Sequence, residues 1–127
     1  MVLSLLHTAA LAVDKTVSTE EELKQAIESV SDGDTITVSG TIEVNAPLVV
    51  THTITLTGGS IVASNNFTSN SNQLADFNLI SLKTAGKTLT LKNITLNANG
   101  KSLVVWYKIS IAPEADMKPR KLCLFLL

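Results

Sequence analysis

The residues that could support chemistry are few, and acidic side chains come first among them. Clustered carboxylates can hold calcium, and a basic residue beside them can abstract or donate a proton. Here the acids near predicted strands are Asp32, Asp34, Glu43 and Asp76, with no two on neighbouring repeats of one side, and no arginine precedes Arg120. The sequence therefore predicts no catalytic, cofactor-binding or metal-binding residue in this chain.

Asp34 and two residues of other reactive types, His52 and Cys123, have structural interpretations. Asp34 precedes a strand, where aspartate commonly serves a turn. His52 has no partner at metal-ligand spacing and is interpreted as an exposed corner residue. Cys123 is the single cysteine, so no internal disulfide can form.

A short amphipathic helix is predicted over residues 19–30. Leu23, Ala26, Ile27 and Val30 recur at helical spacing and form one apolar stripe. Serine and threonine lie three residues before glutamates at its start, as in a capping box. Gly33 follows the last apolar residue and is expected to end the helix. Because a helix of about three turns is marginal alone, it must pack on something.

Three similar segments follow, each with two alternating strands joined by a short turn. They run over residues 35–44, 53–63 and 88–96. In each, the second and fourth residues are apolar and threonines alternate with them, so the two residue types lie on opposite faces.

The spacing of these segments favours a solenoid over a stack of hairpins. The first two start 18 residues apart, and Leu48 to Val50 lies between them as a third short strand. The next interval is 35 residues, because residues 64–76 form a polar insertion before a third strand that includes Ile80. The prediction is an all-β solenoid, a parallel β-helix of two to three coils, with apolar columns inside and threonine ladders outside.

Residues 17–100 resemble the start of the pectate-lyase-like right-handed parallel β-helix superfamily. The most specific likeness is the segment Glu22 to Ile27, followed by Gly33 to Ile36, which in that superfamily caps the open N-terminal end with an α-helix. The closest likeness is to adhesive β-helix domains of bacterial surface proteins. Because lyases, hydrolases and adhesins share this fold, the resemblance implies a fold more than a function.

Bulk composition narrows the class of protein. The chain has 127 residues, of which 45% are hydrophobic, 4% aromatic and 17% charged, with a net charge of −1. The net charge argues against nucleic acid as a partner, because phosphate binding needs a basic face. No apolar run approaches the roughly 18 residues that a membrane-spanning helix needs.

The chain divides into four parts by composition. Residues 1–16 are interpreted as a truncated signal segment, with Ala10-Leu11-Ala12 resembling a cleavage site. Residues 17–34 form the capping helix and residues 35–100 the β-helix coils. Residues 101–127 contain no Thr, Asn or Gly, and strand alternation ends near Pro113, so this atypical tail is interpreted as truncated or frameshifted sequence.

These features lead to two hypotheses. In the first, the chain is a non-catalytic N-terminal fragment of an exported bacterial surface protein, secreted or held at the cell surface. It would serve as a stalk or contact polysaccharide or host glycan, and could self-associate through its open C-terminal coil. In the second, it caps a polysaccharide lyase or glycoside hydrolase whose active site lies in further coils. The content of those coils would discriminate between the two.

Overall fold

The computed structural model describes residues 11–68, 79–82 and 84–100, together with the backbone of four short strands between residues 105 and 125. Within these residues the fold is β-rich, with one helix and only parallel strand pairs. The elements, in chain order, are β1 (Asp14–Val17), α1 (Glu20–Ser29), β2 (Thr35–Val38), β3 (Thr41–Val44), β4 (Leu48–Val50), β5 (Ile54–Thr57), β6 (Ser60–Ala63), β7 (Ile80–Leu82), β8 (Thr88–Lys92), β9 (Thr95–Asn97), β10 (Val105–Trp106), β11 (Lys108–Ile111), β12 (Asp116–Lys118) and β13 (Leu124–Phe125).

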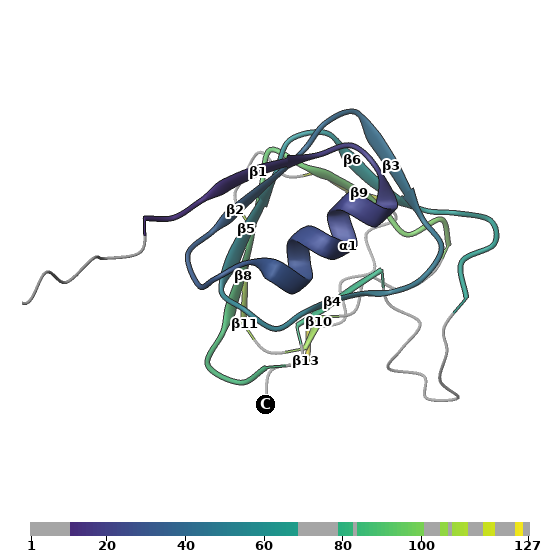
Figure 1. Ribbon diagram of the computed structural model, residues 1–127. Coiled ribbons are helices and arrows are strands. Elements are labelled where there is room, and N and C mark those ends of the chain that lie inside the picture. The colour runs from purple at the N-terminus through teal and green to yellow at the C-terminus, as the bar shows by residue number, and fades with distance from the viewer. Residues whose placement is uncertain are drawn as a thin grey trace, which may run out of the picture.

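The strands lie in three groups around one interior (Figure 1). The first sheet has the order β1-β2-β5-β8-β11, and the second has the order β3-β6-β9-β12. The third group consists of the pairs β4-β7 and β10-β13, with β10 beside β7. The chain therefore visits the first, second and third groups in turn. Each strand pairs with the strand at the same stage of the next pass, except that β7 and β10 are in contact but belong to separate pairs.

The alternation of threonine and apolar residues decides which side of each strand is buried. In the first sheet Ile36 lies opposite Leu56, and Leu56 lies opposite Leu91; all three are at most 2% exposed. Their neighbours Thr35 and Thr55 are partly exposed on the other side. Successive side chains in a strand point to opposite faces, so a period of two is enough to sort the residues. The predicted apolar columns are confirmed.

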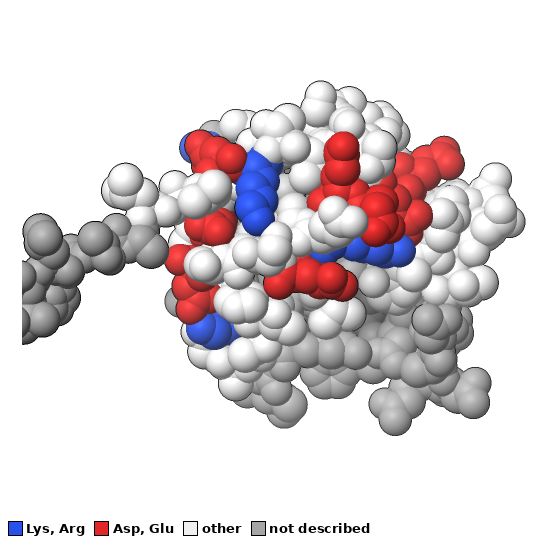
Figure 2. Space-filling model, viewed as in Figure 1, with Lys and Arg blue, Asp and Glu red and all other residues white. Residues whose placement is uncertain are grey.

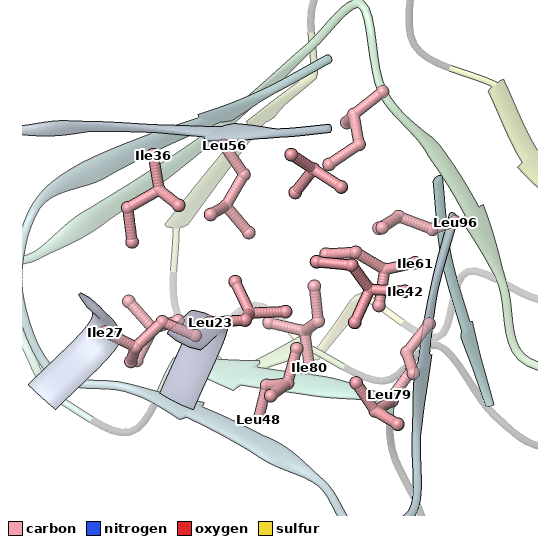
Figure 3. Packing of buried hydrophobic residues seen from close by; sticks show 14 of the residues in the cluster. Leu23, Ile27, Ile36, Ile42, Leu48, Leu56, Ile61, Leu79, Ile80 and Leu96 are labelled. Atoms are coloured by element: carbon pink, nitrogen blue, oxygen red, sulfur yellow. The ribbon is translucent and has the colours of Figure 1, made fainter. Parts of the chain in front are cut away.

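The interior that results is almost entirely aliphatic. Figure 3 shows leucine and isoleucine side chains from all three groups of strands converging with those of α1. Phe67 is the one aromatic residue in this cluster of buried side chains. β-Branched and leucine side chains at matching positions fill a narrow space without large rings.

The helix α1 covers one end of this interior, as Figure 1 shows. Its inner face buries Leu23, Ala26 and Ile27 against the interior, which confirms the predicted apolar stripe. Thr19 is the N-cap, and its Oγ1 accepts a hydrogen bond from the Glu22 N–H at 3.2 Å. The Glu22 carboxylate reaches back to the N–H of Ser18 at 2.8 Å, so one of the two overlapping capping signals is used.

The end of α1 differs from the expectation based on Gly33. The helix ends at Ser29, and Val30 adopts an extended backbone that buries its side chain. Gly33 has a positive φ of 97°, but it lies in the loop before β2, where its N–H donates to the Thr53 carbonyl at 2.7 Å. The apolar side chain of Val30 therefore ends the helix by entering the core, and the glycine serves the following turn.

The register between the first two threonine segments is offset by two residues from the predicted one. Thr35 pairs with Thr55, because Thr53 instead contacts the loop before β2. The backbone N–H of Thr53 donates to Asp32 Oδ1 at 2.8 Å. An offset of two leaves every side chain on its original face. The second interval agrees with the prediction, since Thr55 pairs with Thr90.

Strand β1 and the last strands, β12 and β13, were not evident in the sequence, whereas β11 lies where the residues before Pro113 still alternate. β1 adds a strand to the first sheet beside β2 and includes residues 14–16 of the segment interpreted as a signal. In the last part, the backbone of β11, β12 and β13 continues all three groups, although alternation is lost near Pro113. Residues 1–10, residues 69–76 of the predicted insertion, residues 77, 78 and 83, and most of the tail lie outside the described residues.

Gly58 and Gly59 form a tight turn between β5 and β6, stacked on the turn between β2 and β3. A Cβ atom at Gly59 would lie 2.3 Å from the Gly40 carbonyl oxygen and 2.8 Å from that of Val38. A Cβ atom at Gly40 would meet nothing within 4 Å, although both glycines have positive φ. Close stacking of backbone therefore requires glycine at position 59, whereas position 40 requires only its backbone conformation.

We predict that Gly59→Ala destabilises the fold more than Gly40→Ala. Both variants incur the left-handed backbone cost of about 1–2 kcal/mol. Gly59→Ala adds the cost of overpacking, about 1–3 kcal/mol more. Urea unfolding midpoints measure the difference, and equal losses in the two variants would contradict the stacked turns.

Candidate functional site

Two of the acidic residues that could have formed a reaction centre, Asp34 and Asp32, instead accept hydrogen bonds that stabilise the fold. Asp34 is 5% exposed and ties β1 to the loop after α1. Its Oδ1 accepts from the Val13 N–H and its Oδ2 from the Ser31 N–H, both at 2.9 Å. These two backbone donors hold the pKa of Asp34 below its usual value. The prediction that Asp34 serves a turn is confirmed.

Asp32 is also engaged, at the more exposed edge of the same loop. Its carboxylate forms an ion pair with Lys87 and accepts from the Thr53 N–H at 2.8 Å. The hydrogen bond from Lys87, with that from Thr53, lowers the pKa of Asp32. The contact joins residues 55 positions apart and so connects the loop before β2 to the loop before β8.

His52 lies at the corner between β4 and β5. It adds a small electrostatic contribution to the lowered pKa values of Asp32 and Asp34, after the hydrogen bonds that each carboxylate accepts. Its Nδ1 is 3.1 Å from Thr51 Oγ1. The side chain is half-buried, so the prediction of an exposed corner is right about the corner and wrong about the exposure. Sequence spacing could not reveal this influence, because the loop that carries Asp32 and Asp34 and the corner that carries His52 belong to successive passes of the chain.

The remaining acids do not complete a site in the part of the chain that is described. Glu43 is exposed on β3 and lies opposite Val62 on β6. Asp76 lies outside the described residues. Among the described side chains, no group of three or more His, Cys, Asp or Glu residues is placed to hold a metal ion.

Charged side chains of both signs gather on the capped end of the molecule, which faces the viewer in Figure 2. Glu20, near the start of α1, makes several of the contacts at this end: its Oε1 lies 2.7 Å from Lys24 Nζ, and both of its oxygens accept hydrogen bonds from Asn45, each at 2.8 Å. Partial desolvation raises the pKa of Glu20, but the bonds from Lys24 and Asn45 outweigh it and hold the pKa below its usual value. Glu20 thus fastens α1 to the end of β3.

A shallow groove of about 200 Å³ lies between α1 and β4, lined by Lys24, Ile27, Glu28, Pro47, Leu48 and Val49. Pockets that enclose small ligands usually have about 300–1,000 Å³. The groove is too small for such a ligand. Lys24, the one basic residue among its lining residues, already forms an ion pair with Glu20.

The most regular outward feature is the side of the first sheet that we call the threonine face, formed by Thr35, Thr37, Thr55, Thr57, Thr90 and Lys92. The register places Thr35, Thr55 and Thr90 in one row across three strands, and Thr37, Thr57 and Lys92 in a second row. Neighbouring strands lie about 4.8 Å apart, and alternate residues of a strand about 6.6 Å apart. Hydroxyl groups are thus repeated in two directions on a surface whose β-branched side chains have restricted χ1 angles.

The chemistry of the threonine face is that of hydrogen bonding. Each threonine hydroxyl can donate one hydrogen bond and accept two. The sequence predicted the threonine ladders but not which residues share each row. The two-residue offset between the first two segments places Thr37 beside Thr57, and Thr57 lies beside Lys92. The threonine side chains are half-buried by their neighbours, so the surface offers methyl groups and hydroxyls together.

Comparisons with known proteins do not assign this chain: no protein-family model, curated protein or solved structure matches it. Among the described residues, no helix is long and apolar enough to cross a membrane.

We predict that Asp34→Asn lowers the stability of the fold at neutral pH and makes this stability depend less on pH in the acidic range. Because the folded-state pKa of Asp34 lies below the unfolded value of about 3.9, its contribution is present above that value and is lost as pH falls through the folded pKa. An asparagine would also turn an N–H2 group toward one of two backbone donors. Wild type and variant should therefore differ most near neutral pH and converge in strong acid.

Unfolding midpoints measured from neutral pH down to acid test this, with Glu43→Gln as the control for an exposed carboxylate. A difference between Asp34→Asn and wild type that stays constant with pH would contradict the role of the charged carboxylate.

Proposed function

We propose that this chain is the capped N-terminal part of a right-handed parallel β-helix, and that it acts as a non-catalytic surface unit. The repeated passage through three groups of parallel strands supports the β-helix, and the burial of the α1 stripe against their first strands supports the cap. Such a unit would be exported and would serve as a stalk or contact surface, in line with its resemblance to adhesive domains of bacterial surface proteins.

The threonine face is the observation that supports a contact role. It repeats hydroxyl groups in fixed register over β2, β5 and β8, and Lys92 is the one charged residue among the six that form it. Polysaccharides and host glycans are themselves repeating chains of hydroxyl groups, which exchange hydrogen bonds with hydroxyls directly or through water. Individual contacts of this kind contribute little net free energy, about 0.5–1.5 kcal/mol each, so a repeated array suits a repeating ligand.

The acidic side chains support a non-catalytic role, as far as they are described. Asp32 and Asp34 accept backbone and lysine hydrogen bonds that hold loops together. A proton-transferring or calcium-binding centre needs carboxylates directed toward a common point beside open space. Neither carboxylate has that arrangement.

We predict that the purified chain binds a polysaccharide or glycan and that Thr55→Val/Thr57→Val weakens this binding several-fold. Valine keeps the shape and strand propensity of threonine but removes its hydroxyl. The measurement is co-sedimentation with a panel of insoluble polysaccharides, together with a glycan array. Thr41→Val, on the exposed side of β3, is the matched control and should bind like wild type.

Three results would contradict the proposal. The first is that the chain binds nothing in the panel, and the second is that the double variant binds as well as wild type. The third is that the chain releases soluble sugar products. The last result would favour the cap of a lyase or hydrolase instead.

A further inference from the structure

The turn after β9 ends in the only Asn-Gly pair of the sequence, Asn99-Gly100. Both residues are exposed, and both have positive φ, 47° for Asn99 and 80° for Gly100. Asparagine is a thermolabile residue, and a following glycine places no Cβ atom in the way of its side chain and allows wide backbone rotation. This turn therefore has the two features that spontaneous deamidation needs, access and backbone freedom.

We infer that Asn99 is a site of spontaneous deamidation in the folded protein. The Gly100 backbone nitrogen bonds to Asn99 Cγ, and the Cγ–Nδ2 bond breaks; the proton lost by the Gly100 amide leaves with the side-chain nitrogen as ammonia. A five-membered succinimide results. Water then cleaves one of its two C–N bonds: cleavage at Cγ leaves aspartate, and cleavage at the backbone carbonyl carbon leaves isoaspartate.

The fold distinguishes this pair from the single Asp-Gly pair, Asp32-Gly33, which could form the same ring. The Gly33 N–H donates to the Thr53 carbonyl at 2.7 Å, so the nitrogen that would attack is engaged. The Asp32 carboxylate accepts from Thr53 and Lys87, which favours its ionised form, a poor target for a nucleophile. Gly100 is not seen to donate its N–H to any residue in the described ranges.

One contact restrains Asn99. Its Nδ2, the nitrogen that would leave, donates to Asn65 Oδ1 at 2.9 Å, and its backbone N–H donates to Asn97 Oδ1 at 2.9 Å. The first bond joins the turn after β9 to the turn after β6. Breaking it frees the side chain to approach the Gly100 nitrogen, so Asn65 slows the reaction.

Deamidation would alter this junction between successive passes of the chain. It replaces the amide donor by a carboxylate, which adds a negative charge opposite an acceptor oxygen of Asn65. Isoaspartate would also lengthen the backbone by one atom in the turn after β9. Both products weaken the link between the two turns.

The test incubates the full chain at mildly alkaline pH, both folded and in denaturant, and follows it by ion exchange and peptide mapping. In the folded protein we expect one acidic species, with the mass change of NH2 to OH at Asn99, and no isoaspartate at Asp32. In denaturant both positions should react. Protection of Asn99 in the folded protein equal to that of Asp32 would overturn the inference.

Variants test the restraint separately. Asn65→Ala should speed the reaction several-fold, Asn66→Ala in the same turn should leave the rate unchanged, and Asn99→Gln should abolish the acidic species. An Asn65→Ala rate equal to wild type would overturn the restraining role of Asn65. A persisting acidic species in Asn99→Gln would overturn the assignment of the site.

Discussion

Register between successive passes of the chain is the constraint on which the rest of this structure depends. Each pass contributes a few apolar side chains to a shared interior, and each fully buried leucine or isoleucine contributes about 1.5–3 kcal/mol. That gain requires the apolar residues of one pass to lie over those of the next, as Ile36, Leu56 and Leu91 do. The outward threonine rows and the stacked glycine turns follow from the same alignment, because alternation fixes one face once the other is buried.

The open end of such an arrangement needs its own solution, and α1 provides it. Strand edges left unpaired invite association, and apolar side chains left uncovered are costly. β1 pairs with the outer edge of β2, while Leu23 and Ile27 from α1 cover the interior. Glu20 then accepts the backbone N–H of Asn45 just after β3. The acidic residues near the cap are thus part of its construction.

Much of this could be predicted from the sequence, for physical reasons that also explain the failures. The period of two in residues 35–44, 53–63 and 88–96 and the helical spacing of residues 19–30 are strong local signals, and their elements are found where expected. β1 buries only Val17, so it has almost no periodic signal. The two-residue offset at Thr53 depends on hydrogen bonds to a distant loop. Such long-range pairing has no local signature in the sequence. For this reason the sequence could not show which residues form the threonine face, or that Asp32 binds Lys87 and Thr53.

The pairing of Thr35 with Thr55 is the most direct consequence of the parallel register. In a Cys123→Ser background, Thr35→Cys/Thr55→Cys places two thiols on neighbouring strands, within the range of about 4.4–6.8 Å between Cα atoms that disulfides require. Mild oxidation followed by mass spectrometry of the unreduced chain measures the bond. The account predicts efficient cross-linking of this pair and little for Thr35→Cys/Thr53→Cys. Cross-linking of the second pair in preference to the first would contradict the register, and with it the arrangement of the whole interior.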